Sequence, residues 1–177
     1  MAYTFDWNDR RPDSELTREE IVERNIAAVE VHFHNENPEH VEKAVAVYTD
    51  DIVWEIPARG LLLRSASEVL DAYRDIFKSV IYEKVFYLRR FATEKYVIDD
   101  QVAYVTKVED LMPNHNFPVG TKLSVRLLHC FEMRDGRIAR EIAYEMWRVR
   151  GSEVDHDDII DTAIIEEFPP VDAIPAP

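Results

Sequence analysis

His129 lies in a segment that alternates between apolar and polar residues. Between Lys122 and Met133, one set of alternate residues is apolar apart from the histidine: Leu123, Val125, Leu127, His129, Phe131 and Met133. Successive side chains of a strand point to opposite faces, so we expect this set to face the interior. An imidazole titrates near neutral pH, so an inward histidine could take up or release a proton. The alternative is a core histidine hydrogen-bonded to a backbone carbonyl.

A second inward histidine is expected on a helix near the N-terminus. His32 follows Val29 by three residues and Ile21 by eleven, which places it on the apolar stripe of that helix. His32 and His129 could then work as an acid–base pair in which one ring is neutral while the other is charged. The alternative is a helix-end histidine that interacts with the last carbonyl groups.

A carboxylate and a phenol complete the predicted catalytic set. Glu109 and Asp110 are adjacent near the end of a predicted strand, so one of them faces inward. The alternation favours Asp110, a bulge would exchange the two, and both could instead be solvated. On the last long strand, Tyr144 and Met146 share the apolar set, and the phenol could donate to a substrate oxygen. Large side chains near the same pocket are predicted to bind substrate: Tyr48, Trp54, Leu127, Phe131 and Met146.

The sequence lacks the residue patterns that metal binding, nucleophilic catalysis and phosphate binding require. The histidines of His32-Phe33-His34 fall on opposed sides of a helix, and no His-x-x-x-His spacing occurs, so we predict no metal site. Cys130 alternates with His129, which excludes a Cys–His nucleophile pair on one strand face. The four glycines form neither a Gly-x-Ser-x-Gly elbow nor a phosphate-binding loop. We therefore expect chemistry without a cofactor.

The whole-chain composition limits the partners. A net charge of −14 over 177 residues argues against nucleic acid and against an anionic membrane surface. One cysteine suits a reducing compartment, and no apolar run resembles a signal peptide or a membrane span. The expectation is a single globular domain in the cytoplasm that acts on a small molecule.

The elements that must position these residues change character along the chain. Helical spacing of apolar residues predicts three early helices, within residues 17–33, 38–48 and 65–77, with a short strand at 52–56. Thr17 and Glu20 form a capping-box pattern at the N-terminus of the first of these helices. Alternation then predicts strands at 85–91, 96–98, 101–111, 122–133 and 137–149, with turns at Asp99-Asp100 and Asp135-Gly136.

Helices followed by strands predict an α+β fold. We expect a curved antiparallel sheet that forms a cone, with the N-terminal helices packed on its concave face and a small-molecule pocket in its mouth. This domain would span residues 1–150 with an N-terminal extension. Residues 151–177 would form an acidic, proline-ended tail, which either packs on a sheet or acts as a lid. Asp157 or Asp158 could cap a short helix in it.

Three segments resemble one known family. Tyr48–Pro57 reads Y-T-D-D-I-V-W-E-I-P, Phe117–Lys122 reads F-P-V-G-T-K, and Phe131–Ile138 reads F-E-M-R-D-G-R-I. In order and spacing these segments are similar to the SnoaL-like polyketide cyclases of the nuclear-transport-factor-2-like superfamily. The likeness covers about Thr17 to Val149. Because this scaffold hosts cyclases, isomerases, dehydratases, epoxide hydrolases, lyases and non-catalytic modules, it implies the fold more strongly than the reaction.

Functional positions of the family carry over only in part. Where ketosteroid isomerases have an aspartate base directly before the first-strand proline, this chain has Ile56. The position that matches their oxyanion-hole acid is His129, and the nearest counterpart of their helix-one tyrosine is His32 or a neighbour. The Asp–Arg–Asp arrangement of the related epoxide hydrolases has no match. The resemblance therefore implies an acid–base enzyme, of lyase or dehydratase type, on a small hydrophobic aromatic or polyketide-like molecule. A cyclase or isomerase, or a non-catalytic binding module, is the alternative, and we expect a homodimer formed through the exposed sheet.

Overall fold

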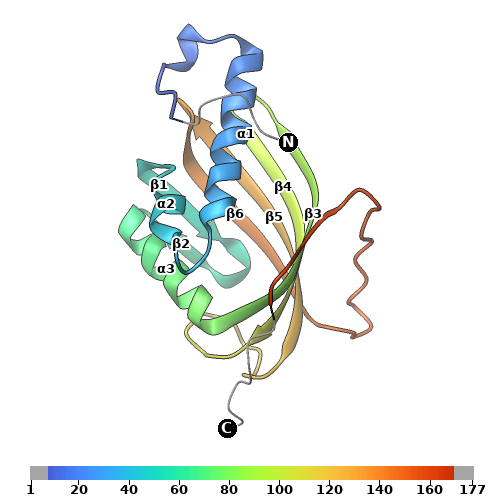
Figure 1. Ribbon diagram of the computed structural model, residues 1–177. Coiled ribbons are helices and arrows are strands. Elements are labelled where there is room, and N and C mark those ends of the chain that lie inside the picture. The colour runs from blue at the N-terminus through green and yellow to red at the C-terminus, as the bar shows by residue number, and fades with distance from the viewer. Residues whose placement is uncertain (1–7, 170–177) are drawn as a thin grey trace.

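The computed structural model describes residues 8–169 and has an α+β fold, as expected (Figure 1). The helices are α1 (Arg18–Asn35), α2 (Val41–Val45) and α3 (Ala66–Ser79), with short 3-10 turns η1 (Asp13–Glu15) and η2 (Pro57–Arg59). The strands are β1 (Tyr48–Ile56), β2 (Leu61–Leu63), β3 (Val80–Ala92), β4 (Tyr96–Lys107), β5 (Lys122–Arg134), β6 (Arg137–Val149) and β7 (Ile164–Glu167).

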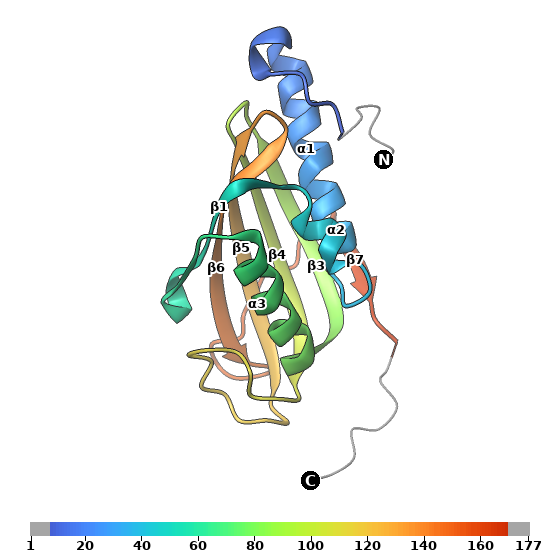
Figure 2. The same cartoon turned by 90° about the vertical axis from the view of Figure 1, so that its left-hand side faces the viewer.

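All strands join one curved sheet in the order β2-β1-β6-β5-β4-β3-β7. The three helices lie on one face of it, as Figure 2 shows. The sheet is mixed rather than wholly antiparallel, because β1 pairs parallel with β6. The main core lies between this face and the helices, with Trp54, Tyr73 and Phe131 among its fully enclosed side chains. The helices thus close the concave side of the sheet.

Local sequence signals explain two helix starts. The Thr17 hydroxyl accepts from the backbone N–H of Glu20, and the Glu20 carboxylate accepts from that of Thr17 at 2.8 Å, so the predicted capping box is present. Ser65 caps α3 by accepting from the N–H of Glu68. Each bond satisfies an amide that has no partner within the helix. Pro38 lies in a turn before α2 rather than in the first turn of that helix.

The turn predicted at Asp99-Asp100 is wrong, because β4 runs without interruption through both residues. Arginines on neighbouring strands neutralise the two carboxylates. Arg90 donates to Asp99 at 2.7 Å, while Arg89 and Arg126 donate to Asp100 at 2.8 Å and 2.6 Å. Paired charges of this kind let acidic residues stay in a buried strand.

A bulge in the hairpin of β5 and β6 decides which side chains face inward. Asp135 and Gly136 form the predicted turn with φ angles of 48° and 71°. Met133 pairs with Ile138, whereas Glu132 pairs with Arg140, so Ala139 is an extra residue in β6. One extra residue exchanges the two faces for the rest of a strand. Glu141, directly opposite the buried Phe131, therefore shares its inward face.

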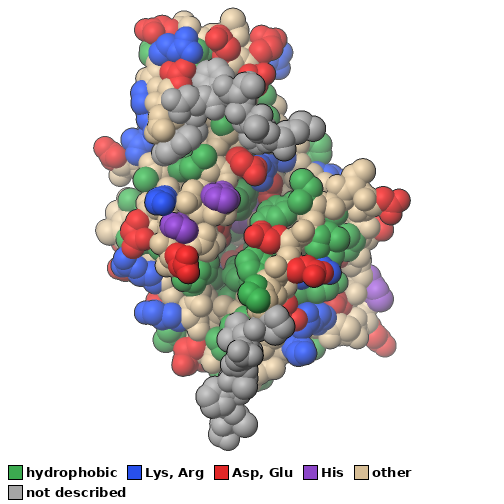
Figure 3. Space-filling model, viewed as in Figure 1, with side chains coloured by type: hydrophobic (Ala, Val, Ile, Leu, Met, Phe, Trp, Pro, Cys, Tyr) green, Lys and Arg blue, Asp and Glu red, His purple; other side chains and the backbone are tan. Residues whose placement is uncertain are grey.

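The described part of the C-terminal tail packs on the opposite, convex face of the sheet. Ile159, Ile160 and Ala163 contact a cluster on β3 and β4, and β7 then pairs with the edge of β3. The short helix predicted after Asp157 or Asp158 is absent, because that segment is irregular. Figure 3 shows apolar side chains gathered along this tail, where Ile164 is 71% exposed. Residues 1–7 of the predicted extension and 170–177 of the proline-rich end lie outside the described residues.

Candidate functional site

The helices and the concave face of the sheet enclose a narrow cavity with a volume of about 30 Å³. Its walls come from the C-terminal end of α1, from β1, α3, β3, β5 and β6, and from the loop after β4. They combine carboxylates, aromatic rings and aliphatic side chains: Glu36, Trp54, Tyr73, Ile76, Tyr82, Met112, Val125, Leu127, His129, Glu141, Ala143, Glu145 and Trp147. Largely apolar clefts with a few polar groups are typical of small-molecule sites.

His129 faces this cavity from β5, as its alternation predicted, and is 5% exposed. Its ring stacks on Phe131 at 5.7 Å between centroids and meets the edge of Phe33 at 5.2 Å. The Gln101 amide lies 3.4 Å from Nδ1 and can donate to it. This contact assigns the proton of a neutral ring to Nε2, to which no described residue hydrogen-bonds. Nε2 is therefore the nitrogen available to a ligand.

Glu141 of β6 lines the same cavity and is 1% exposed. The Tyr48 hydroxyl donates to Oε2 at 2.5 Å, and the Tyr73 hydroxyl lies 3.4 Å from Oε1. The two phenol oxygens are 3.1 Å apart. Burial and the charge of Glu141 raise the pKa of both tyrosines well above 10, so they remain neutral donors. A buried carboxylate is thereby held in one orientation.

His32 is fully buried behind this group and does not line the cavity. Its Nδ1 lies 3.2 Å from the carbonyl oxygen of Ala44, so Nδ1 carries the proton and donates. Its Nε2 lies 3.3 Å from the Tyr73 hydroxyl and 3.6 Å from Oε2 of Glu141. Burial lowers the pKa of His32, against the opposing effect of Glu141. The expected pair of cavity-facing histidines is therefore wrong in its geometry: His129 reaches the cavity and His32 supports its wall.

Glu36 follows the last residue of α1 and reaches into the cavity wall. Its Oε2 is buried without a hydrogen-bond partner and lies 3.5 Å from Nε2 of His32. Burial, followed by the negative charges of Glu141 and Asp99, raises the pKa of Glu36 well above its usual value. The side chain therefore favours its protonated form when the cavity is empty.

Arg59, at the end of η2, supports the other end of the cavity. Its Nε and Nη2 donate to the two oxygens of Glu145 at 2.9 Å and 3.2 Å. The indole of Trp147 also donates to Glu145, at 2.7 Å. Arg59 and Glu145 are 3% and 5% exposed, so a bidentate ion pair fixes this wall.

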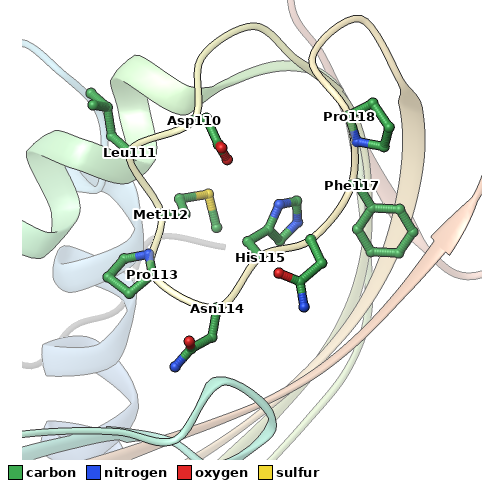
Figure 4. A pocket seen from close by; sticks show the side chains of 9 residues that line it. Asp110, Leu111, Met112, Pro113, Asn114, His115, Phe117 and Pro118 are labelled. Carbon is green, nitrogen blue, oxygen red and sulfur yellow. The ribbon is translucent and has the colours of Figure 1, made fainter.

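The loop after β4 covers this end and encloses a hollow of its own, lined by residues 110–118. Figure 4 shows the ring of His115 and the thioether of Met112 on the inner side of the loop, and Asn114 on its outer side. Asn114 donates to the carbonyl oxygen of Arg59 at 2.6 Å, and the rings of His115 and Trp147 form a T-shaped pair with centroids 4.4 Å apart. The titratable cavity residues lie outside this hollow, so we place the candidate site in the cavity.

Glu109 and Asp110 are corrected by the structure. Both are exposed residues of this loop, because β4 ends at Lys107. The Asp110 carboxylate accepts from the ammonium of Lys107 at 2.5 Å, and this contact lowers its pKa. Neither side chain lines the cavity. Of the placements that the sequence left open, the structure shows both carboxylates exposed to solvent.

Tyr144 and Met146 are corrected as well. They are 44% and 49% exposed on the convex face, because the bulge at Ala139 reverses the alternation on which their prediction rested. The other predicted substrate-binding residues divide into two groups. Trp54 and Leu127 line the cavity, whereas Tyr48 and Phe131 are buried behind it.

The sequence reasoning missed the acidic wall. Glu36, Glu141 and Glu145 were not among the predicted site residues, since no local pattern marks a bulge and no pattern brings the end of a helix to a distant strand. One signal was present: Arg59 stands in an otherwise apolar segment between Ile56 and Leu63. Among residues 8–169, no three histidine, cysteine or acidic side chains are placed to hold a metal ion.

The family of this chain follows from its similarity to known proteins. The SnoaL-like domain family matches residues 29–141. The chain belongs to the SnoaL-like family. No curated protein matches it. In the part of the chain that is described, no helix is long and apolar enough to cross a membrane.

Solved structures of related fold are distant in sequence. An LEH-like epoxide hydrolase of M. tuberculosis is 21% identical, with a TM-score of 0.54 over 71% of this chain and 84% of that chain. A protein assigned as a polyketide cyclase, from Xanthomonas campestris pv. campestris, is 15% identical, with a TM-score of 0.59 over 70% and 91%. A nuclear-transport-factor-2-like protein of Burkholderia xenovorans is 14% identical, with a TM-score of 0.58 over 71% and 91%. These likenesses show the fold of this SnoaL-like chain.

Proposed function

We propose that this chain is an acid–base enzyme that needs no cofactor and acts on a small hydrophobic, aromatic or polyketide-like molecule. The observation that carries the proposal is that Glu141 and His129 face one cavity from adjacent strands. His129 stands opposite Ala143 on β6. Glu141 is therefore its diagonal neighbour, and the Cα atoms of such a cross-strand pair are roughly 7–8 Å apart. The reacting substrate atom would lie between these two side chains.

Glu141 is the proposed general base. It would remove a proton from a carbon next to a carbonyl group, and the phenols of Tyr48 and Tyr73 would keep it oriented. His129 is the proposed donor: Nε2–H would hydrogen-bond to the carbonyl oxygen as negative charge develops on it. Expulsion of a leaving group or cleavage of the adjacent bond would complete an elimination.

His32 is the proposed positioning residue of this site. It touches Tyr73 and stands close to Glu141, so its neutral ring would keep the phenol and the carboxylate in register. Replacement of His32 by Gln should then change the pH profile and kcat more than KM. A purely structural role would instead lower thermal stability without moving the pH profile.

Two other functions use the same residues. Ring closure of a polyketide begins with the same proton abstraction, and the likeness to the Xanthomonas protein assigned as a polyketide cyclase makes it the second candidate. Epoxide hydrolysis is less favoured, because the described residues that line the cavity include neither aspartate nor arginine. A non-catalytic binding module would bind a small molecule in the same cavity without proton transfer.

The proposed function is tested by deuterium exchange into a panel of aromatic ketones in D2O, followed by proton NMR. Wild type should catalyse exchange next to the carbonyl, and Glu141→Gln and His129→Gln should each slow it by roughly two to four orders of magnitude. Tyr144→Phe, on the convex face, is the matched control and should keep the wild-type rate. A binding module would give no exchange above buffer and only stability changes in the variants.

We also propose a cytoplasmic homodimer formed through the convex face of β6, where Tyr144 and Met146 are exposed. Exposed apolar side chains on a sheet are typical of interaction surfaces. Light scattering after size-exclusion chromatography should give the dimer mass for wild type and the monomer mass for a Tyr144→Lys, Met146→Lys double variant. A wild-type monomer would contradict this proposal.

A further inference from the structure

The walls of the cavity carry carboxyl groups, and no cation of the described chain faces them from inside the cavity. Glu36, Glu141 and Glu145 line it, and no lysine or arginine is among its described lining residues. Arg59 approaches Glu145 from behind and is engaged with both of its carboxylate oxygens. Glu36 and Glu141 have no cationic partner of this kind.

Among residues 8–169, Glu36 finds neither a hydrogen-bond donor nor a cationic partner. Its Oε2 is buried and receives no hydrogen bond. The nearest ring nitrogen, Nε2 of His32, has no proton to offer in the tautomer that donates to Ala44. An unpaired buried carboxyl group is costly, and its charged form is costlier still. A donor that carries positive charge would remove both costs.

Aromatic rings form the rest of this wall. Trp54 and Tyr73 have ring centroids 5.7 Å apart, and the indole of Trp147 is fixed by its hydrogen bond to Glu145. Tyr82 also lines the cavity. Carboxylates next to aromatic faces form the environment in which proteins bind ammonium groups, through Coulomb attraction and cation–π contacts.

We propose that the ligand of this cavity carries a protonated or quaternary amine on a small apolar body. Its nitrogen would lie between Glu36 and Glu141, near the rings of Trp54 and Tyr73, and its apolar part would extend along Ile76, Val125 and Leu127. The net charge of −14 would draw such a cation toward the protein. This inference rests on the proposed function, because it assigns a substrate class to the same cavity.

The test compares three probes of similar shape: 2-phenylethylamine, 2-phenylethanol and phenylacetate. Affinities are measured by calorimetry at low salt, and the ring signals of His129 report by NMR whether each probe enters the cavity. Wild type should bind the amine roughly 5- to 30-fold more tightly than the alcohol and should exclude the acid. Glu36→Gln and Glu141→Gln should each reduce that preference to about twofold or less.

Glu23→Gln is the matched control. It removes the same charge from the exposed face of α1 and should leave the preference unchanged. If the alcohol moves the His129 signals and binds as tightly as the amine, the charge inference is overturned while the proposed function stands. Tightest binding of phenylacetate would overturn it too. If no probe moves the His129 signals, this inference fails together with the cavity on which the proposed function depends.

Discussion

Glu141 of β6 lies diagonally across the sheet from His129 of β5, with the small side chain of Ala143 directly opposite the imidazole. The cavity passes over Ala143, because an alanine leaves free the volume that a larger residue would fill. A base and a hydrogen-bond donor can therefore reach the same ligand from one sheet. This arrangement depends on the bulge at Ala139, which turns Glu141 inward.

Filling that volume should abolish ligand binding. Ala143→Leu adds three carbons beside His129 and should weaken binding of any cavity ligand by at least tenfold. Overpacking should also cost roughly 1–3 kcal/mol of unfolding free energy. Calorimetric titration and urea unfolding measure the two effects. Ala139→Leu, in the bulge outside the cavity lining, is the control for binding, and equal loss in both variants would contradict this role for Ala143.

Glu36 should make stability depend on pH. Its pKa is raised in the folded protein, chiefly by burial. The folded state therefore holds this proton more tightly than the unfolded state does. The associated stability is complete below the unfolded pKa, near 4.5, and is lost as pH rises through the folded pKa. Relative to wild type, Glu36→Gln should gain stability in urea unfolding as pH rises above 4.5. A difference that does not vary with pH would contradict this assignment.

His115 should act with the opposite sign. Burial, with Lys107 and Arg59 nearby, lowers its pKa to about 4 from an ordinary 6.5. The unfolded chain takes up this proton as pH falls below 6.5, whereas the folded chain does so only near pH 4. Stability is therefore lost across that interval as the pH falls. His115→Gln should flatten the acid limb of the stability curve, and an unchanged limb would show that His115 is solvated.

The positive φ of Gly136 provides a test of the hairpin. Its φ is 71°, and a Cβ there would lie 2.6 Å from Nε of the buried Arg24. Gly136→Ala should lower the unfolding free energy by roughly 1–3 kcal/mol, from backbone strain and from displacement of the arginine. Gly151→Ala, also at positive φ but with open space around it, should cost less. Equal costs would indicate that the contact with Arg24 contributes nothing.

Elements with a strong local signal could be predicted from the sequence. The capping box at Thr17, the turn at Asp135-Gly136 and the alternation around His129 each depend on neighbouring residues, and all three are present. The family motifs were recognised for the same reason, and the family match confirms them.

The site was predicted only in part. The inward position of Glu141 depends on one extra residue in β6, and that of Glu36 depends on where α1 ends against the sheet. Asp99-Asp100 resembled a turn because the arginines that neutralise it lie on other strands. Such contacts are set by tertiary structure, which alternation and spacing do not contain.

The tautomer of His129 tests the central claim most directly. Nitrogen NMR of the ring should find the proton on Nε2, since the Gln101 amide occupies Nδ1. Addition of a cavity ligand should shift the Nε2 signal, and Glu141→Gln should alter that response. A proton on Nδ1, together with ring signals that no ligand moves, would contradict a catalytic His129 and would leave it as a packed core histidine.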